Sequence, residues 1–183
     1  GTDRDPEGAL ELYRTAAEAG HPPSMYRLGA YYSGAVEGSE DPEKCRYWFE
    51  RAAEAGMELA YPEIAGIYLY GYGTEADSAK AYGWYRKAAD AGDPLSMFKV
   101  GYMASEGVGI EKDMDEAVRM FRMAAVAGVP EAMFKMAALA AEGRVEGGER
   151  AAFSWYSSAA EAGFMPAKFN LATMYYEGQG TKR

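Results

Sequence analysis

The segment Ala16-Ala17-Glu18-Ala19-Gly20 occurs five times in this sequence with small variations. The later copies close at Gly56, Gly92, Gly128 and Gly163, so the steps between the closing glycines are 36, 36, 36 and 35 residues. A near-constant period in this range is typical of stacked helical repeats. The alanines allow a neighbouring helix to approach closely, and the glycine takes the left-handed conformation that ends a helix. The sequence therefore predicts an array of helical repeats.

Each alanine segment ends a helix whose beginning is also marked. Aspartate stands at the expected N-cap, and proline follows it in the first two copies (Asp5-Pro6, Asp41-Pro42, Asp77 and Asp113). In the fourth copy Glu116 lies three residues after the aspartate, which is the spacing of a capping box. Inside these helices two columns of large side chains face a row of alanines four residues on. The columns are Leu12, Trp48, Trp84, Met120, Trp155 and Tyr13, Phe49, Tyr85, Phe121, Tyr156.

A second helix is expected after each glycine, with proline in its first turn at Pro22, Pro94, Pro130 and Pro166. This helix carries a small-residue column where two helices must cross closely: Gly29, Ala65, Gly101, Ala137 and Ala172. Pro62 falls four residues later than its counterparts, so this helix should start late or bend. The connection at 33–40 also differs, because its first glycine comes one residue early. The prediction is ten helices in five antiparallel pairs, forming one continuous all-α domain without strands.

On these residues the chain resembles the Sel-one-like repeat family, a relative of the tetratricopeptide repeats. The best matches to its motifs are residues 84–92 and residues 96–101 with the turn at 107–109. The resemblance covers nearly all of residues 1–183 and implies an α-solenoid, a right-handed superhelix whose second helices line the concave face. It implies full repeats at 21–56, 57–92, 93–128 and 129–163, flanked by single helices at 1–20 and 164–183. It also implies a bacterial source and leaves the compartment, cytoplasmic or exported, open.

Composition excludes several classes of function. The chain has 183 residues, 49% hydrophobic and 26% charged, which is the composition of an ordinary soluble domain. No stretch reaches the roughly 18–20 apolar residues of a membrane span, so we expect no membrane insertion. The net charge of −9 argues against a nucleic-acid partner and favours a neutral or basic one. A single cysteine rules out a disulfide framework within the chain.

No residue pattern indicates catalysis, a metal or a cofactor. His21 is the one histidine and stands in a turn, where a capping or solvated role is typical. Cys45 occupies a column otherwise filled by alanine, so it is interpreted as a buried small residue without a neighbouring base. The glycine turns at 71–73, 107–109 and 178–180 lack the strand and the lysine-serine pair of a phosphate-binding loop. Secreted family members carry a cysteine pair in every repeat, so their activities are not transferred to this chain.

The remaining candidates for function are surface residues of the concave helices. One column forms an aromatic stripe, Tyr26, Pro62, Phe98, Phe134 and Phe169, which either faces the groove or packs between neighbouring repeats. Other positions expected to face the groove are Leu69, Tyr70, Tyr102, Ser105, Glu106, Glu142, Asn170, Thr173, Tyr176 and Glu177. Tyr70, Tyr102 and Tyr176 are the strongest candidates, because each departs from the small or polar residues of its column.

The sequence thus predicts a protein-interaction scaffold that binds a peptide or an extended protein segment along the concave face. Tyrosine and phenylalanine would stack on the partner, Ser105, Asn170 and Thr173 would form hydrogen bonds, and the glutamates would favour lysine or arginine. A structural module that associates end to end is the alternative, since residues 181–183 follow directly on a glycine turn and leave the last repeat without an evident cap. A third hypothesis, a hydrolase of cell-wall fragments, rests only on activities reported for the family.

Overall fold

The structure of the protein is a computed structural model that describes residues 5–180, and this range contains ten α-helices and no strand. The prediction of an all-α repeat fold with ten helices is therefore confirmed. The chain divides after Ala91 into two compact units, which we call unit 1 and unit 2. Residues 181–183, which entered the hypothesis of an uncapped last repeat, lie outside the described range.

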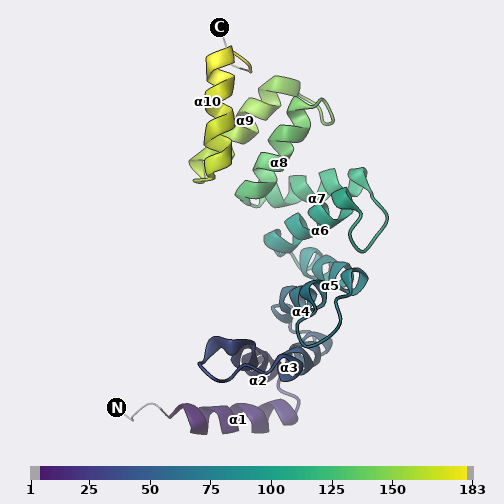
Figure 1. Cartoon of the computed structure of the whole chain (residues 1–183), viewed down its shortest axis with the longest axis vertical. Coiled ribbons are helices and arrows are strands. Elements are labelled where there is room, and N and C mark those ends of the chain that lie inside the picture. The colour runs from purple at the N-terminus through teal and green to yellow at the C-terminus, as the bar shows by residue number, and fades with distance from the viewer. Residues whose placement is uncertain (1–4, 181–183) are drawn as a thin grey trace. The chain divides into compact units, whose positions relative to one another are not determined.

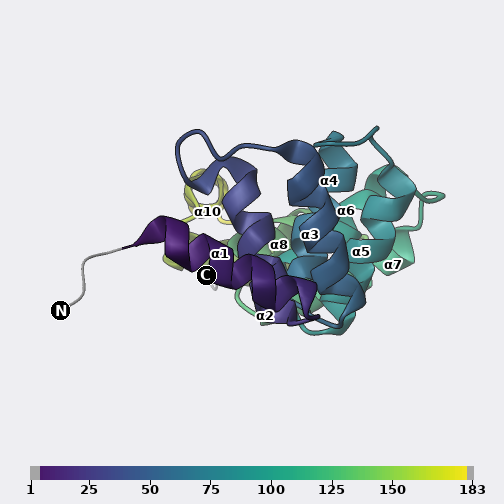
Figure 2. The same cartoon turned by 90° about the horizontal axis from the view of Figure 1, so that it is seen from below.

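Unit 1 holds five α-helices: α1 (Pro6–Glu18), α2 (Pro22–Ala30), α3 (Pro42–Glu54), α4 (Ala60–Tyr70) and α5 (Ser78–Asp90). Helix α2 packs between α1 and α3, and α4 packs between α3 and α5 (Figures 1 and 2). Helix α2 runs on into a π-helical turn, Tyr31–Ala35, in which Gly34 has φ of 90°. This turn contains the early glycine that sets the 33–40 connection apart from the others in sequence.

Unit 2 holds the other five: α6 (Pro94–Glu106), α7 (Met114–Val126), α8 (Pro130–Ala141), α9 (Gly148–Glu161) and α10 (Met165–Glu177). Helix α7 packs between α6 and α8, and α9 packs between α8 and α10 (Figure 1). Each helix thus buries its apolar stripe against its neighbours in the chain order, which is the packing of a helical repeat.

The helix starts follow the predicted capping chemistry. The carboxylates of the four aspartates accept the backbone N–H three residues on, at 2.9–3.1 Å: Asp5 from Gly8, Asp41 from Lys44, Asp77 from Lys80 and Asp113 from Glu116. In a capping box, the Glu116 side chain would accept a hydrogen bond from the Asp113 N–H. Here that N–H donates instead to the carbonyl of Ala104 in α6, at 2.9 Å. Helix α4 begins four residues after its glycine instead of two, and the predicted late start is confirmed.

Close packing within each helix pair explains the small-residue column. A Cβ added at Gly29 would lie 2.8 Å from the Phe49 ring, and one added at Gly101 would lie 2.8 Å from the Phe121 ring. Phe49 and Phe121 are both buried. The glycine backbone therefore forms the surface against which the large side chain of the following helix packs.

Candidate binding grooves

Three hollows on the surface of the units have equivalent positions in the repeat. The α1/α2 groove has a volume of about 730 Å³ and the α3/α4 groove about 440 Å³, both in unit 1. The α7/α8 groove, in unit 2, has about 200 Å³. Each groove lies chiefly between a helix that ends in an alanine segment and the helix that follows it.

The lining residues of the three grooves correspond to one another at offsets of 36 and 72 residues. The floor carries a small residue in all three grooves: Ala30, Gly66 and Ala138. An aromatic ring from the preceding helix lines each groove as well: Tyr13, Phe49 and Phe121. The position of the groove is therefore a property of the repeat, whereas its volume and its walls differ from one copy to the next.

The α3/α4 groove is aromatic and acidic. Phe49 and Tyr85 are buried at its base, Tyr70 is 75% exposed at its rim, and Glu63 is its carboxylate. The Tyr72 hydroxyl donates to Glu40 Oε1 at 2.9 Å, which orients that ring at the edge of the groove. Burial, then the charges of Tyr70 and Glu63, raises the pKa of Tyr85 to about 12.

Cys45 lines the same groove but is only 1% exposed. Burial, with smaller contributions from Glu63 and Asp41, raises the pKa of its thiol to about 12. The thiol is therefore neutral and a poor nucleophile. Its counterparts Ala81 and Ala117 are fully buried, which agrees with the interpretation of this column as small core residues.

The α7/α8 groove has the opposite character, because charged side chains of both signs surround it. Lys112, Lys135 and Arg144 line it together with Glu106 and Glu142. Arg144 Nε lies 3.3 Å from Glu142 Oε2, so part of this charge is paired inside the groove. The corresponding wall position is occupied by Glu63 in the α3/α4 groove and by Lys135 here.

Five residues that the sequence singled out line these grooves: Pro62, Tyr70, Ser105, Glu106 and Glu142. Ser105 is buried, and its hydroxyl donates to the Tyr102 carbonyl of the same helix at 2.8 Å. The hydrogen bond that Ser105 was expected to donate to a partner is therefore already made within α6. The Thr173 hydroxyl likewise donates to the Phe169 carbonyl, at 3.2 Å.

The aromatic stripe divides into packed and exposed members. The Phe98 ring lies 5.7 Å from that of Phe121, and the Phe134 ring lies 5.4 Å from those of Tyr156 and Phe164. These two therefore pack against other helices. Phe98 packs within its own repeat, and Phe134 contacts both its own repeat and the next one. Outside the three grooves, Phe169, Tyr176, Tyr102 and Glu177 are exposed, while Leu69 and Asn170 are half-buried.

Sequence reasoning did not single out Glu63, Gly66, Tyr72 or Tyr85 as groove residues. Tyr85 was assigned to the packing column of its helix, and the other three stand in columns whose chemistry varies among the copies. The signal that could have found them is the small residue at 30, 66 and 138, because a methyl group or no side chain leaves the hollow open.

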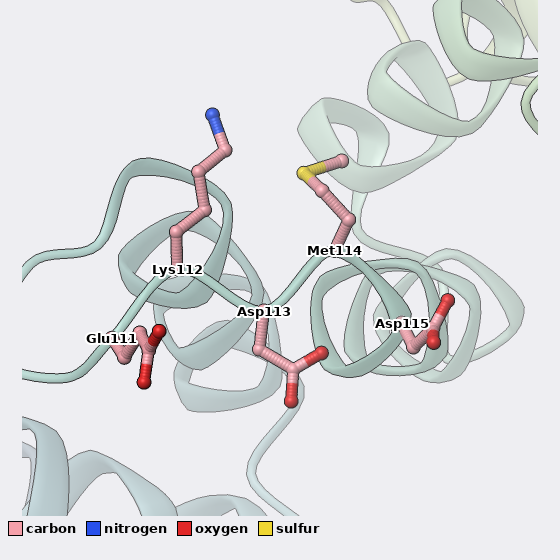
Figure 3. Close-up of a pocket in the computed structure, with 5 residues that line it drawn as sticks. All are labelled: Glu111, Lys112, Asp113, Met114 and Asp115. Carbon is pink, nitrogen blue, oxygen red and sulfur yellow. The ribbon is translucent and has the colours of Figure 1, made fainter.

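A further surface hollow, of about 320 Å³, lies at residues 111–115 (Figure 3). Figure 3 shows Lys112 and Met114 extending to one side of the backbone and the Asp113 carboxylate to the other. Asp113 is the N-cap of α7, and its carboxylate already accepts the Glu116 N–H. The hollow has no set of converging side chains and is not a candidate site.

The described residues also limit other kinds of site. Within residues 5–180 no three His, Cys, Asp or Glu side chains gather in a way that could hold a metal ion. No helix in that range is long and apolar enough to cross a bilayer. His21 is the N-cap residue of α2, and its Nδ1 lies 2.8 Å from Ser24 Oγ.

Comparison with known proteins places this fold among described ones. The family model for the Sel1 repeat matches residues 1–21, 22–57, 63–93, 94–129, 130–164 and 166–183. No curated protein matches the chain.

Solved structures with similar folds share the repeat architecture. One is c5321, a protective antigen present in uropathogenic Escherichia coli strains that displays an SLR fold; its TM-score is 0.88 at 36% identity over 95% of this chain and 38% of its own. A Sel1 repeat protein from Oxalobacter formigenes matches with a TM-score of 0.78 at 26% identity, over 93% of this chain and 77% of its own. Helicobacter pylori cysteine rich protein B matches in fold, with a TM-score of 0.53 at 22% identity, over 69% of this chain and 90% of its own. The chain spans less than two fifths of the length of c5321.

Proposed function

This chain belongs to the Sel1 repeat family, and on that premise we propose that it is an interaction scaffold whose helical grooves hold an extended segment of a partner protein. Proteins of this family are generally protein–protein interaction modules and are typically non-enzymatic. The proposal concerns where on this chain the partner lies and which side chains hold it.

The observation that carries the proposal is the recurrence of one groove with changing walls. The α1/α2, α3/α4 and α7/α8 grooves keep a small floor residue and an aromatic ring, while the charged or aromatic side chains around them differ. A groove that recurs at the same place in the repeat suits an extended partner whose side chains enter such grooves. The differing walls would give each groove its own preference among side chains.

Exposed tyrosines add anchors beside the grooves. Tyr70 is 75% exposed and Tyr102 is 44% exposed. A tyrosine buries a large area on binding, and it has few rotatable bonds to immobilise. We expect these two side chains to contribute to partner affinity, and Tyr70→Ala combined with Tyr102→Ala tests that contribution.

The groove hypothesis is tested by filling each groove with a leucine side chain. Random peptides displayed on phage are selected on the wild-type chain, and the affinities of the selected peptides are then measured for Ala30→Leu, Gly66→Leu and Ala138→Leu. The change at Gly66 is structurally mild, because an added Cβ would meet only the Tyr85 Oη, at 3.8 Å, and Gly66 lies in a regular helix. Gly83→Leu is the matched control, since Gly83 is an exposed glycine of α5 with open space around it.

We expect selected peptides to lose about tenfold or more in affinity for at least one filled groove, because an anchor side chain would be excluded from its pocket. Affinity for Gly83→Leu should stay within about twofold of wild type. Failure to select any peptide would refute the proposal, as would peptides that bind all three filled variants as tightly as the wild type.

An assembly role is the second candidate, and the exposed face of α10 favours it. Phe169 is 74% exposed, although its counterparts Phe98 and Phe134 pack against another helix, and Tyr176 is 93% exposed. Such a face could pack on a second copy of the chain. Sedimentation equilibrium of wild type and Phe169→Ser tests this: association that the substitution abolishes supports assembly, and a monomer at all concentrations excludes it.

A further inference from the structure

The α3/α4 groove differs from the other two in combining aromatic rings with a carboxylate and lacking a positive charge. Its charged lining residue is Glu63, whereas Arg27 lines the α1/α2 groove at the same position and Lys135 the α7/α8 groove. Resting on the function proposed above, we infer that the α3/α4 groove is a recognition site for a cationic side chain, lysine or arginine, of the partner. Three features support this assignment: the rings, the hydroxyl of Tyr85 and the local charge.

The rings of this groove are free to receive a cation. Elsewhere in unit 1, Lys44 Nζ lies 5.3 Å from the centre of the Tyr32 ring, and Lys80 Nζ lies 5.0 Å from that of Tyr68. Across the described range 5–180, no lysine or arginine occupies the corresponding place over a ring of the α3/α4 groove. A positive group is attracted to the face of a tyrosine ring, so Tyr70 and its neighbours offer unoccupied acceptors for one.

The hydroxyl of Tyr85 provides a second acceptor. Tyr85 is 7% exposed and its side chain lines the groove, where its Oη lies next to the α4 backbone at Gly66. Within residues 5–180 the buried side-chain oxygen that lacks a hydrogen-bond partner is Ser96 Oγ, so the Tyr85 hydroxyl is not an unsatisfied buried group. Its oxygen can accept a hydrogen bond from a donor that enters the groove. The N–H groups of lysine and arginine are such donors.

The carboxylate of Glu63 is the charged group that lines the groove. Within residues 5–180, Glu63 accepts a long hydrogen bond from the Tyr26 hydroxyl, at 3.5 Å, and keeps acceptor capacity for a ligand. Two cations of α3 are paired with nearby carboxylates: Lys44 Nζ lies 2.7 Å from Asp41 Oδ2, and Arg46 lies 2.8 Å from Glu50 Oε2. The third, Arg51, donates to the Tyr47 hydroxyl at 3.2 Å. The net charge of −9 for the whole chain adds a long-range attraction for a basic segment.

The equivalent grooves define what the site should reject. In the α7/α8 groove, Lys135 replaces Glu63, and Glu142 and Arg144 replace Tyr70 and Tyr72. In the α1/α2 groove, Arg27 stands in the place of Glu63. A cationic side chain would meet a like charge at this wall position in both, although Asp5 and Glu7 also line the α1/α2 groove. The preference for lysine or arginine should therefore be strongest in the α3/α4 groove.

The test uses small probes on the whole chain, so that it does not depend on finding the partner. Nα-acetyl-lysine methylamide, its arginine counterpart and the neutral norleucine analogue are titrated separately into ¹⁵N-labelled protein, and amide shifts are followed by NMR. We expect the two cationic probes to give saturable shifts at Gly66 and Tyr70, with millimolar dissociation constants that rise at higher salt. The norleucine analogue should give weaker shifts by about tenfold in affinity, because it lacks the charge.

Variants locate the interaction. Glu63→Gln should weaken the cationic probes about tenfold, and Glu63→Lys, which reproduces the charge of Lys135, should abolish their binding. Glu75→Gln is the matched control, because Glu75 is an exposed acid outside the groove lining and its change should leave affinity unaltered. Equal binding of the norleucine analogue, shifts centred outside the groove, or no effect of Glu63→Gln would overturn the inference.

These results are separable from those on the proposed function. Peptides selected through the α1/α2 or α7/α8 groove would uphold the scaffold even if the cationic probes failed to bind, and would overturn only the present inference. Conversely, probe binding that depends on Glu63, together with a failed peptide selection, would leave a cation site on a chain that is not a peptide scaffold.

Discussion

Alanine substitutions at two helix-interior glycines should have opposite effects on stability. Gly101 of α6 and Gly66 of α4 stand one column apart in the repeat, and both have ordinary helical backbone conformations. At Gly101 an added Cβ would lie 2.8 Å from Phe121 Cδ1 and 3.2 Å from the Ala117 carbonyl oxygen. At Gly66 the nearest atom is the Tyr85 Oη, at 3.8 Å, which is an ordinary van der Waals contact.

The magnitudes follow from two opposing effects. Alanine in place of glycine favours a helix by about 1 kcal/mol at either site, because glycine loses more backbone freedom on folding. At Gly101 the new methyl group would have to displace the buried Phe121 ring by several tenths of an ångström, and overpacking of this kind costs about 1–3 kcal/mol. Gly66→Ala should therefore stabilise the chain by about 0.5–1 kcal/mol, and Gly101→Ala should destabilise it by up to about 2 kcal/mol.

Urea unfolding followed by tryptophan fluorescence distinguishes the two effects. Trp155 is the one tryptophan of unit 2, which contains Gly101, while Trp48 and Trp84 report on unit 1, which contains Gly66. Far-ultraviolet circular dichroism checks that both variants keep the helix content of the wild type. A rise in the unfolding midpoint for both variants, or a higher midpoint for Gly101→Ala than for Gly66→Ala, would refute the account of the small-residue column.

Three further predictions test packing and ionisation. Phe134→Ala should lower the free energy of unfolding by about 3 kcal/mol, because its ring packs on two other aromatic rings. Phe169→Ala should stay within about 0.5 kcal/mol of the wild type in the same urea assay, because that ring is exposed. Equal losses of stability would contradict the different burial of these two members of the stripe. The pKa of Cys45 rises from 9.0 to about 12 on folding, so this thiol favours the folded state below pH 9. That contribution to the free energy of unfolding falls as the pH rises towards 12, by about 2 kcal/mol at pH 10.5. Cys45→Ala should remove this part of the stability loss at high pH, and a pH profile of stability equal to that of the wild type would refute the prediction. Gly73→Ala should sharply lower the midpoint temperature of thermal unfolding, because Gly73 has φ of 69° and an added Cβ would overlap the Pro42 carbonyl. A midpoint temperature within a degree of the wild type would contradict the close approach of this turn to α3.

Local sequence features determined the helices themselves. The aspartates at the N-caps, the prolines in the first turns and the glycines at the ends act within a few residues of the chain, so their effect can be predicted without knowing the neighbours. Even the late start of α4 was predicted from the shifted Pro62, whereas the π-helical turn after α2 was not predicted from the early Gly34. The period of 36 residues identified the repeat for the same reason.

Tertiary structure decided which of these side chains meet and which remain exposed. The α3/α4 groove draws on residues from Ser33 to Tyr85, contributed by several helices, and its openness depends on the missing side chain at Gly66. Phe134 and Phe169 share a column, yet one is packed and the other exposed, because burial depends on whether another helix covers the position. The sequence by itself therefore determined the repeat and its helices, which arise from contacts close along the chain. Only the packing of separate helices decided the grooves, because their walls are made of side chains far apart in sequence.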